Sequence, residues 1–253
     1  MNEAPSSRAD NGLFWRVEEA CRAAWPAESE TVVDGWLLRR SGGQTRRTNS
    51  VNPLPGRRGA GPELFDAAEA HYRRHGQVPI FRVTDFAPDL SRELHRRGYS
   101  VQAQTLALKA RFDRPGDWPA DGVRLSEAPE RDWMELRDRL AVDPTIFRDM
   151  VARIRHPKAF AFARAEGRTV AIAFGVVVNG LLVVESVATH PNFRGRGLAR
   201  RVVGALMNWA WRRDAAGACL QVLADNEPAL AAYAALGFDA ELYRYHYRFA
   251  PDP

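Results

Sequence analysis

A glycine-rich turn flanked by arginines is the stretch of this sequence best suited to bind a charged ligand. It reads Arg194-Gly-Arg-Gly197-Leu-Ala199, follows an apolar segment that ends at Thr189, and precedes apolar residues at helical spacing. Glycines at such a turn let the backbone approach a ligand closely. The first N–H groups of a helix have no partner inside it, and with the helix dipole they favour a diphosphate. Taken alone, the stretch also fits an ordinary glycine turn with solvated arginines.

A second segment follows the next apolar stretch and carries a tyrosine. Asn226, Pro228, Tyr233 and Gly237 stand at spacings typical of a short capped helix. Asn226 can cap the start of that helix, Pro228 fits its first turn, and Gly237 fits a cap at its end. Tyr233 is either a functional hydroxyl or one more aromatic in an apolar stripe.

Together the two segments resemble the cosubstrate site of the GNAT N-acetyltransferases. The pattern Arg194-x-x-Gly197-x-Ala199 after an apolar strand is similar to the signature of that family, and the segment from Asn226 to Phe238 is similar to its second motif. The resemblance covers residues 123–249. It implies an α/β fold of the α+β type with a mixed sheet, acyltransferase activity, and acetyl-CoA as cosubstrate without a metal.

The resemblance also implies a role for individual residues. Asn226 would contact the pantetheine arm, and Tyr233 would lie near the thioester sulfur. Backbone groups at the end of the strand would line the pantetheine arm, at Val187, Ala188 and Thr189. The turn would hold the pyrophosphate through Arg194, Gly195, Arg196, Gly197, Leu198 and Ala199.

Transfer of an acetyl group to an amine needs both a base and an acid. An amine of pKa about 10.4 is protonated at neutral pH, which costs roughly 4.6 kcal/mol before it can attack. Glu185 is the only carboxylate in the apolar strand before the turn, so it is the candidate base, with an ordinary strand glutamate as the alternative. A thiolate whose conjugate acid has a pKa of about 8.5 can take a proton from a positioned tyrosine, here Tyr233. Neither Cys21 nor Cys219 lies on a motif position, so we expect direct attack in a ternary complex.

Composition excludes several other classes of protein. The 253 residues are 45% hydrophobic and 26% charged, as in folded globular chains. The net charge of +5 comes almost entirely from arginine, since Lys109 and Lys158 are the only lysines, and acidic residues are interspersed, so we expect no nucleic-acid partner. Residues 1–11 are polar and the apolar run 171–188 is broken at Asn179-Gly180, so we expect neither a secretory signal nor membrane insertion. Two cysteines without disulfide or metal spacing favour a cytoplasmic location.

A stretch rich in Pro, Gly and Asp predicts two domains. Residues 113–121 form the expected linker between an N-terminal domain, 1–112, and a catalytic domain, 122–253. The first half repeats the second: Arg58–Gly61 matches Arg194–Gly197, and a second matching pair lies about 140 residues apart in the same order. We therefore predict two GNAT-like modules in tandem.

The first module is expected to lack a cosubstrate site of its own. Pro62 removes a helix N–H group, and Glu63 stands where the second module has Ala199. The counterpart of Tyr233 falls on Glu93 or Leu94, so the acid is missing too.

Periodicity predicts the elements that carry these motifs. Asn179-Gly180 predicts a type I′ hairpin, and a final strand pair is expected within 240–249. The other strands are expected at 123–125, 158–163, 170–178, 181–189 and 218–223, and helices at 129–140, 144–154 and 198–209.

The acceptor and the alternatives stay open from the sequence alone. We expect a small-molecule or peptide amine, and the oligomeric state is open. Within the stretch 34–50, Arg46 or Arg47 could hold a carboxylate or phosphate of the acceptor, or the stretch could be an amphipathic hairpin with solvated arginines. A longer acyl or aminoacyl donor is one alternative. A non-catalytic acyl-CoA sensor is another, although such a protein would not need Tyr233.

Overall fold

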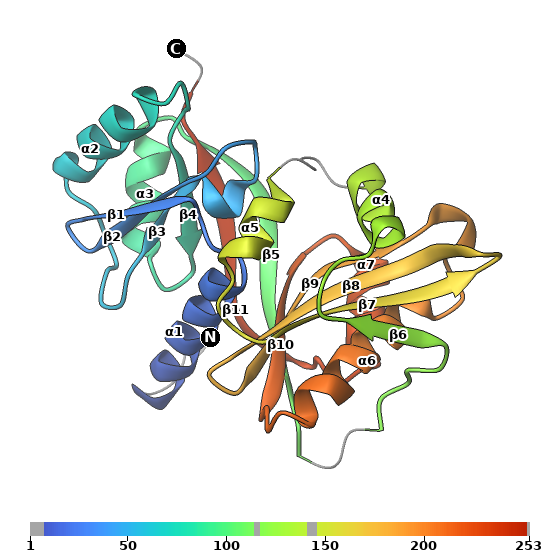
Figure 1. Ribbon diagram of the computed structural model, residues 1–253. Helices are drawn as coiled ribbons and strands as arrows, with labels where there is room; N and C mark the ends of the chain where they lie inside the picture. Colours follow the sequence, from blue (N-terminus) through green and yellow to red (C-terminus); the bar gives the residue numbers. More distant parts are fainter. Residues whose placement is uncertain (1–7, 114–116, 141–145, 252–253) are drawn as a thin grey trace.

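The strands form one continuous mixed sheet with helices on both of its faces. The computed structural model describes residues 8–113, 117–140 and 146–251, and within them eleven strands pair in the order β1-β2-β3-β4-β11-β5-β10-β9-β8-β7-β6 (Figure 1). The strands are β1 (Ser29–Val33), β2 (Trp36–Arg40), β3 (Ser50–Pro53), β4 (Ile80–Thr84), β5 (Ser100–Arg111), β6 (Val123–Ser126), β7 (Lys158–Ala165), β8 (Arg168–Val178), β9 (Leu181–Thr189), β10 (Gly217–Leu223) and β11 (Ala240–Phe249). The helices are α1 (Arg8–Ala24), α2 (Pro62–Arg73), α3 (Pro88–Arg96), α4 (Arg131–Leu140), α5 (Phe147–Arg153), α6 (Leu198–Trp211) and α7 (Glu227–Ala234), with short 3-10 turns at Arg46–Thr48 and Pro191–Phe193.

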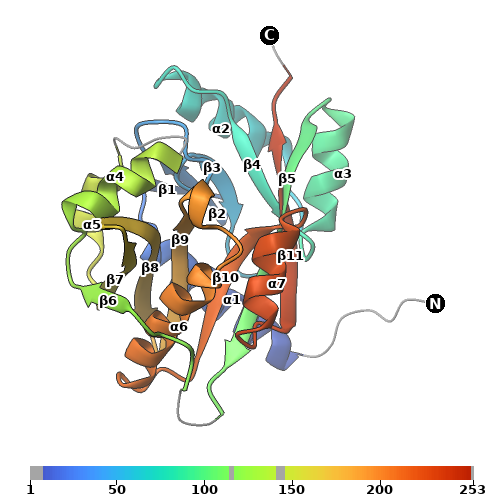
Figure 2. The same ribbon diagram turned by 90° about the vertical axis from the view of Figure 1, so that its right-hand side faces the viewer.

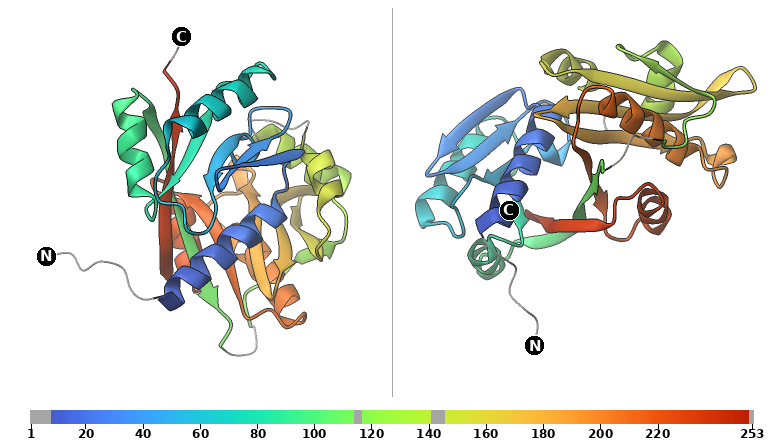
Figure 3. Two further views of the ribbon diagram at one scale, coloured as in Figure 1. Left: turned by 90° about the vertical axis from the view of Figure 1, so that its left-hand side faces the viewer. Right: turned by 90° about the horizontal axis from the view of Figure 1, so that it is seen from below.

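The last strand of the chain lies between two strands of the first half. β11 pairs antiparallel with β4 on one edge and with β5 on the other, while β5 also pairs with β10 (Figures 1 and 3). The expected strand pair within 240–249 is therefore wrong, because this segment is a single strand. β4 and β5, both from the first half, pair with the two edges of β11, so the segment does not fold back on itself in a hairpin. The register between β11 and β5 shifts at two places.

The two halves contain the same strand–helix–strand unit at the repeated segments. β3 runs parallel to β4 across α2, and β9 runs parallel to β10 across α6. The hairpin between β8 and β9 has φ of 48° at Asn179 and 74° at Gly180, and two positive φ values are those of the expected type I′ turn. Of the expected helix 144–154, α5 is described, whereas residues 144–145 and the linker residues 114–116 lie outside the described residues.

Opposite faces of the sheet are covered by helices from different parts of the chain (Figure 2). On one face α6 buries Val202, Val203 and Leu206 against β7, β8 and β9. On the other face α1 and α4 bury Val17 and Trp133 against β8 and its neighbours. Within the described residues, no helix combines the length and the apolar character needed to cross a membrane.

The fit of α6 against residues 118–119 gives a stability prediction. A Cβ atom on Gly204 would lie 2.3 Å from the carbonyl oxygen of Pro119, so Gly204→Ala should lower the free energy of unfolding by about 1–3 kcal/mol. Gly12 in α1 has no atom within 4 Å of the same position, so Gly12→Ala should raise it by about 0.5–1 kcal/mol. Urea unfolding followed by circular dichroism measures both, and shifts of the same sign would contradict this packing.

Candidate active site

The main cleft opens where two parallel strands stop pairing. β9 and β10 are in register from Leu181 opposite Gly217 to Val184 opposite Leu220, and the pairing ends there. Both strands continue, to Thr189 in β9 and to Leu223 in β10. The end of β9 therefore faces a gap on the side of β10 while β8 still holds its other edge.

A bulge at Ser186 bends β9 at this point. Ser186 has φ of +51°, which is uncommon for a residue with a side chain, and the register of β9 against β8 shifts between Phe174 and Ile172. Val187, Ala188 and Thr189, which follow the bulge, line the cleft. These are the three residues that the sequence predicted to contact a pantetheine arm.

The floor of the cleft is the start of α6. Gly195 and Gly197 have φ of 75° and 70°, and Gly197 occupies the N-cap position without a side-chain hydrogen bond to the helix. A residue with a Cβ atom is strained at such φ values, so glycine is needed for this turn. The N-terminus of α6, with its unpaired N–H groups and positive dipole end, is thus presented to the cleft.

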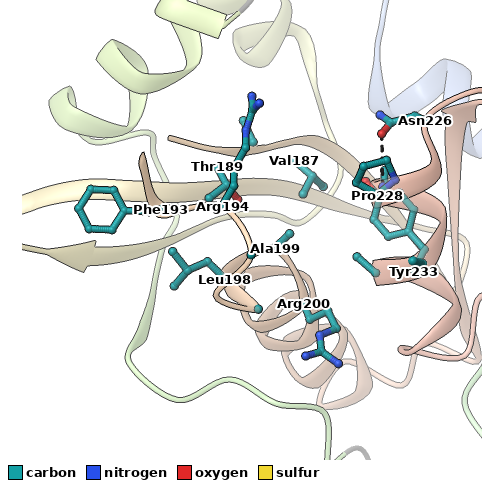
Figure 4. Close-up of a pocket in the computed structure, with 16 residues that line it drawn as sticks. Val187, Thr189, Phe193, Arg194, Leu198, Ala199, Arg200, Asn226, Pro228 and Tyr233 are labelled. Carbon is teal, nitrogen blue, oxygen red and sulfur yellow. Dashed lines mark hydrogen bonds between the residues drawn. The ribbon is translucent and has the colours of Figure 1, made fainter. Parts of the chain in front are cut away.

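Two helices and one strand enclose the main cleft, whose volume is about 790 Å³. Figure 4 shows Asn226 and Tyr233 on one side, and Thr189 with Arg194 across from them. Asn226 caps α7 by accepting a hydrogen bond from the Ala229 N–H at 3.3 Å. The lining residues are Val187, Ala188, Thr189, Phe193, Arg194, Gly195, Gly197, Leu198, Ala199, Arg200, Asn226, Pro228, Ala229, Ala231, Ala232 and Tyr233.

The arginine side chains of the turn do not all point to the cleft. Arg196, which the sequence predicted as a ligand contact, has its guanidinium 4.9 Å from the centre of the Phe193 ring and donates a hydrogen bond to the Asn192 carbonyl at 3.4 Å. Its side chain is therefore held outside the lining. Arg200, one turn into α6, lines the cleft instead. Its position three residues after Gly197 places both on the same side of the first helical turn.

Tyr233 is nearly buried in α7, and only 9% of its surface is exposed. Its ring packs edge-on against Phe238 at 5.9 Å. Burial first, and then the negative charge of Glu185, raise the pKa of Tyr233, while Arg47 opposes this shift. The hydroxyl therefore stays protonated at neutral pH, as a proton donor must.

Glu185 is buried and forms an ion pair with a residue of the first half. Both carboxylate oxygens accept hydrogen bonds from Nη1 of Arg47, 138 positions away in the sequence. The Glu185 side chain is 4% exposed and the Arg47 side chain 29%. Burial lowers the pKa of Arg47, but the carboxylate of Glu185 more than offsets this, so the pKa is raised overall. Arg47 therefore keeps its positive charge.

A second cavity, which we call the junction cavity, adjoins the main cleft. It has a volume of about 310 Å³ and shares Val187 and Ala188 with the main cleft. The remaining lining comes from both halves of the chain: Trp25, Thr45, Arg47, Arg137, Glu185 and Ser186. Trp25 and Arg137 were missed by the sequence analysis, because no local pattern links α1 or α4 to the end of β9. Ligands in the two cavities would meet at Val187 and Ala188.

The matching turn of the first half is closed by its own side chain. Gly61 is the N-cap of α2, and an added Cβ atom there would lie 2.6 Å from a carboxylate oxygen of Glu63. An acidic side chain thus lies at the helix N-terminus where the second half presents free N–H groups. Among the described residues, no cluster of three His, Cys, Asp or Glu side chains could hold a metal ion.

Comparison with solved structures identifies the fold. A GCN5-related N-acetyltransferase from Kribbella flavida superimposes with a TM-score of 0.69, is 15% identical, and the match covers 98% of each chain. A tandem GNAT protein from the clavulanic acid biosynthesis pathway has a TM-score of 0.60 at 16% identity, covering 100% of this chain and 90% of the other. These matches show that the chain has the fold of the GNAT proteins.

A sequence family model places the chain more narrowly. The model described as "Probable histone acetyltransferase Rv0428c C-terminal" matches residues 15–249, and the chain belongs to this family of GNAT acetyltransferases. The uncharacterized N-acetyltransferase YobR of Bacillus subtilis (strain 168) is 23% identical over 242 residues, which are 92% of this chain and 97% of YobR.

The unequal burial of the ion pair leads to a second prediction. Arg47→Met leaves the buried Glu185 charge without a partner and should lower the free energy of unfolding by about 1–3 kcal/mol, less than for a fully buried pair because water reaches Arg47. Glu185→Gln leaves a guanidinium that water can solvate, so the loss should be below about 1 kcal/mol. Urea unfolding at pH 7 measures both, and a larger loss for Glu185→Gln would refute the asymmetry.

Proposed function

We propose that the protein transfers an acetyl group from acetyl-CoA to a primary amine by direct attack in a ternary complex. The observation that carries this proposal is the N-terminus of α6, which opens into the main cleft at Gly197 opposite Tyr233. Bound acetyl-CoA supplies an activated acetyl thioester whose carbonyl carbon the amine attacks.

The lining of the main cleft fits this cosubstrate in charge and in shape. Arg194 and Arg200 provide positive charge beside the α6 N-terminus, where the diphosphate would bind. The apolar wall of α7 and the bulged end of β9 leave a channel for the pantetheine arm between them. Backbone N–H groups of β9 beyond Ser186 would stabilise the negative charge that develops on the carbonyl oxygen.

Two side chains can complete the proton transfers. Glu185 lines the junction cavity, two residues before Val187, which both cavities share, so it can accept the proton of the ammonium group directly or through water. Tyr233 can donate its proton to the leaving sulfur as the C–N bond forms and the C–S bond breaks. Glu185 passes this first proton to solvent and can then accept the second proton that the nitrogen loses as the amide forms. Tyr233 recovers its own proton from solvent, so one proton is released per turnover.

The cosubstrate site can be tested at its glycine turn. Gly197→Ala introduces a Cβ atom at φ of +70° and should weaken acetyl-CoA binding by at least about tenfold, because the backbone N–H groups no longer reach the diphosphate. Isothermal titration calorimetry measures the dissociation constant. Gly61→Ala is the matched control in α2 and should leave acetyl-CoA affinity unchanged. The reverse pattern would place the cosubstrate in the first half and overturn the proposal.

The acid role of Tyr233 can be separated from its role in binding. Tyr233→Phe removes only the hydroxyl and should lower kcat by about 10²–10⁴-fold, the usual contribution of a positioned acid, with little change in acetyl-CoA affinity. Thiol release with an amine panel gives kcat. Tyr99→Phe, at a buried tyrosine of the first half, is the control. Acetyl-CoA binding without thiol release in wild type would favour the sensor alternative.

A further inference from the structure

The junction cavity has the size of a small acceptor, and each of its charged side chains has a counter-charge. Its charged lining residues are Arg47, Arg137 and Glu185, two cations and one anion. Arg137 donates a hydrogen bond to Asp138 at 3.1 Å and lies over the Phe147 ring at 4.1 Å, which fixes its guanidinium at the wall. Asp138 is therefore the counter-charge of Arg137, as Glu185 is of Arg47, so a neutral zwitterion would meet no excess charge from these pairs.

The ion pair with Glu185 does not use all the hydrogen-bond donors of Arg47. Both oxygens of Glu185 use Nη1, and in the part of the chain that the structure describes, the Nε and Nη2 atoms of Arg47 have no hydrogen-bond partner. The side chain is 29% exposed and lines the junction cavity as well as a second cavity beside α1. Its guanidinium also lies 5.5 Å from the centre of the Trp25 ring, which limits its rotation.

The unused edge of the Arg47 guanidinium has the geometry of a carboxylate receptor. Nε–H and Nη2–H point in parallel and match the two oxygens of a planar carboxylate. The ion pair of Arg47 and Glu185 is a fixed dipole, and a zwitterion complements it end to end: its carboxylate on Arg47, its ammonium group toward Glu185.

We propose that the acceptor is an amine that carries a carboxylate near the amino group, as an amino acid does, and that Arg47 holds this carboxylate in the junction cavity. This inference rests on the proposed transfer to an amine. The carboxylate anchors the acceptor on the first half of the chain, and its amino group then faces Val187 and Ala188, which the junction cavity shares with the main cleft.

The neighbouring Arg46 provides a matched control. Its guanidinium lies 5.8 Å and 5.3 Å from the ring centres of Tyr247 and Phe249, and it does not line the junction cavity. Arg46→Lys and Arg47→Lys therefore make the same chemical change at adjacent positions. Only Arg47→Lys removes the bidentate edge, and it keeps a positive charge beside Glu185.

The test uses acceptors that differ only at the carboxylate. Thiol release from acetyl-CoA is measured with glycine, leucine and phenylalanine, each beside its C-terminal amide and its decarboxylated amine. The three forms differ in amine pKa, so kcat/KM is expressed per concentration of free amine. For the best side chain, wild type should prefer the acid over the amide by about 10–100-fold, the range for a hydrogen-bonded ion pair.

The ratio of acid to amide identifies the residue responsible. In Arg47→Lys this ratio should fall to within about threefold of unity, while Arg46→Lys keeps the wild-type ratio. A general loss of folded protein lowers both rates equally and leaves the ratio unchanged, so it cannot imitate the effect. A wild-type preference for amides or decarboxylated amines, or a ratio that survives Arg47→Lys, overturns the inference.

Failure of the underlying reaction would look different. If acetyl-CoA binds but no member of the panel releases thiol, the proposed amine transfer is refuted and this inference with it. If amides are acetylated as well as acids, the transfer stands and only the carboxylate receptor is refuted.

Discussion

The parting of β9 from β10 after Val184 and Leu220 is the constraint on which the site depends. Two strands can separate on their facing edges only if each is held on its other edge. β8 holds β9 past the bulge at Ser186, and β5 pairs with β10 along its whole length, from Gly217 to Leu223. The gap therefore contains backbone that is rigid yet free on one side, which is the arrangement that a ligand with its own hydrogen-bonding groups can fill.

The strand that holds β10 open comes from the other half of the chain. β5 (residues 100–111) stands where the last strand of the second half could have paired, and β11 (residues 240–249) stands correspondingly beside β4. Each half thus completes the sheet of the other. This exchange brings the turn that carries Arg47 near Glu185, so the first half supports the cleft through β5 and lines the junction cavity through Arg47.

What could be predicted from the sequence is what local chemistry determines. The turn at Gly197 and the cap at Asn226 follow from residue types at short spacing, and Asn179-Gly180 fixes where β9 begins, so these elements were placed correctly. Strand partners are not encoded locally, which is why the pairing of β11 was wrong. The Arg196 side chain lies against the Phe193 ring and so points away from the main cleft. The sequence alone gives no reason why Arg194, and not Arg196, should line the cleft.

The two helix N-termini show how one repeated unit acquires two roles. At α6, Ala199 leaves the first N–H groups open to the main cleft, whereas at α2 the carboxylate of Glu63 lies against the same position. A carboxylate beside a helix N-terminus repels a phosphate, so the α2 terminus is less suited than the α6 terminus to bind one. The first half contributes to the junction cavity through Arg47, which lies just before β3 and forms the ion pair with Glu185. The difference is electrostatic: one half opens a positive helix terminus to the main cleft, and the other half supplies a side-chain cation to the junction cavity.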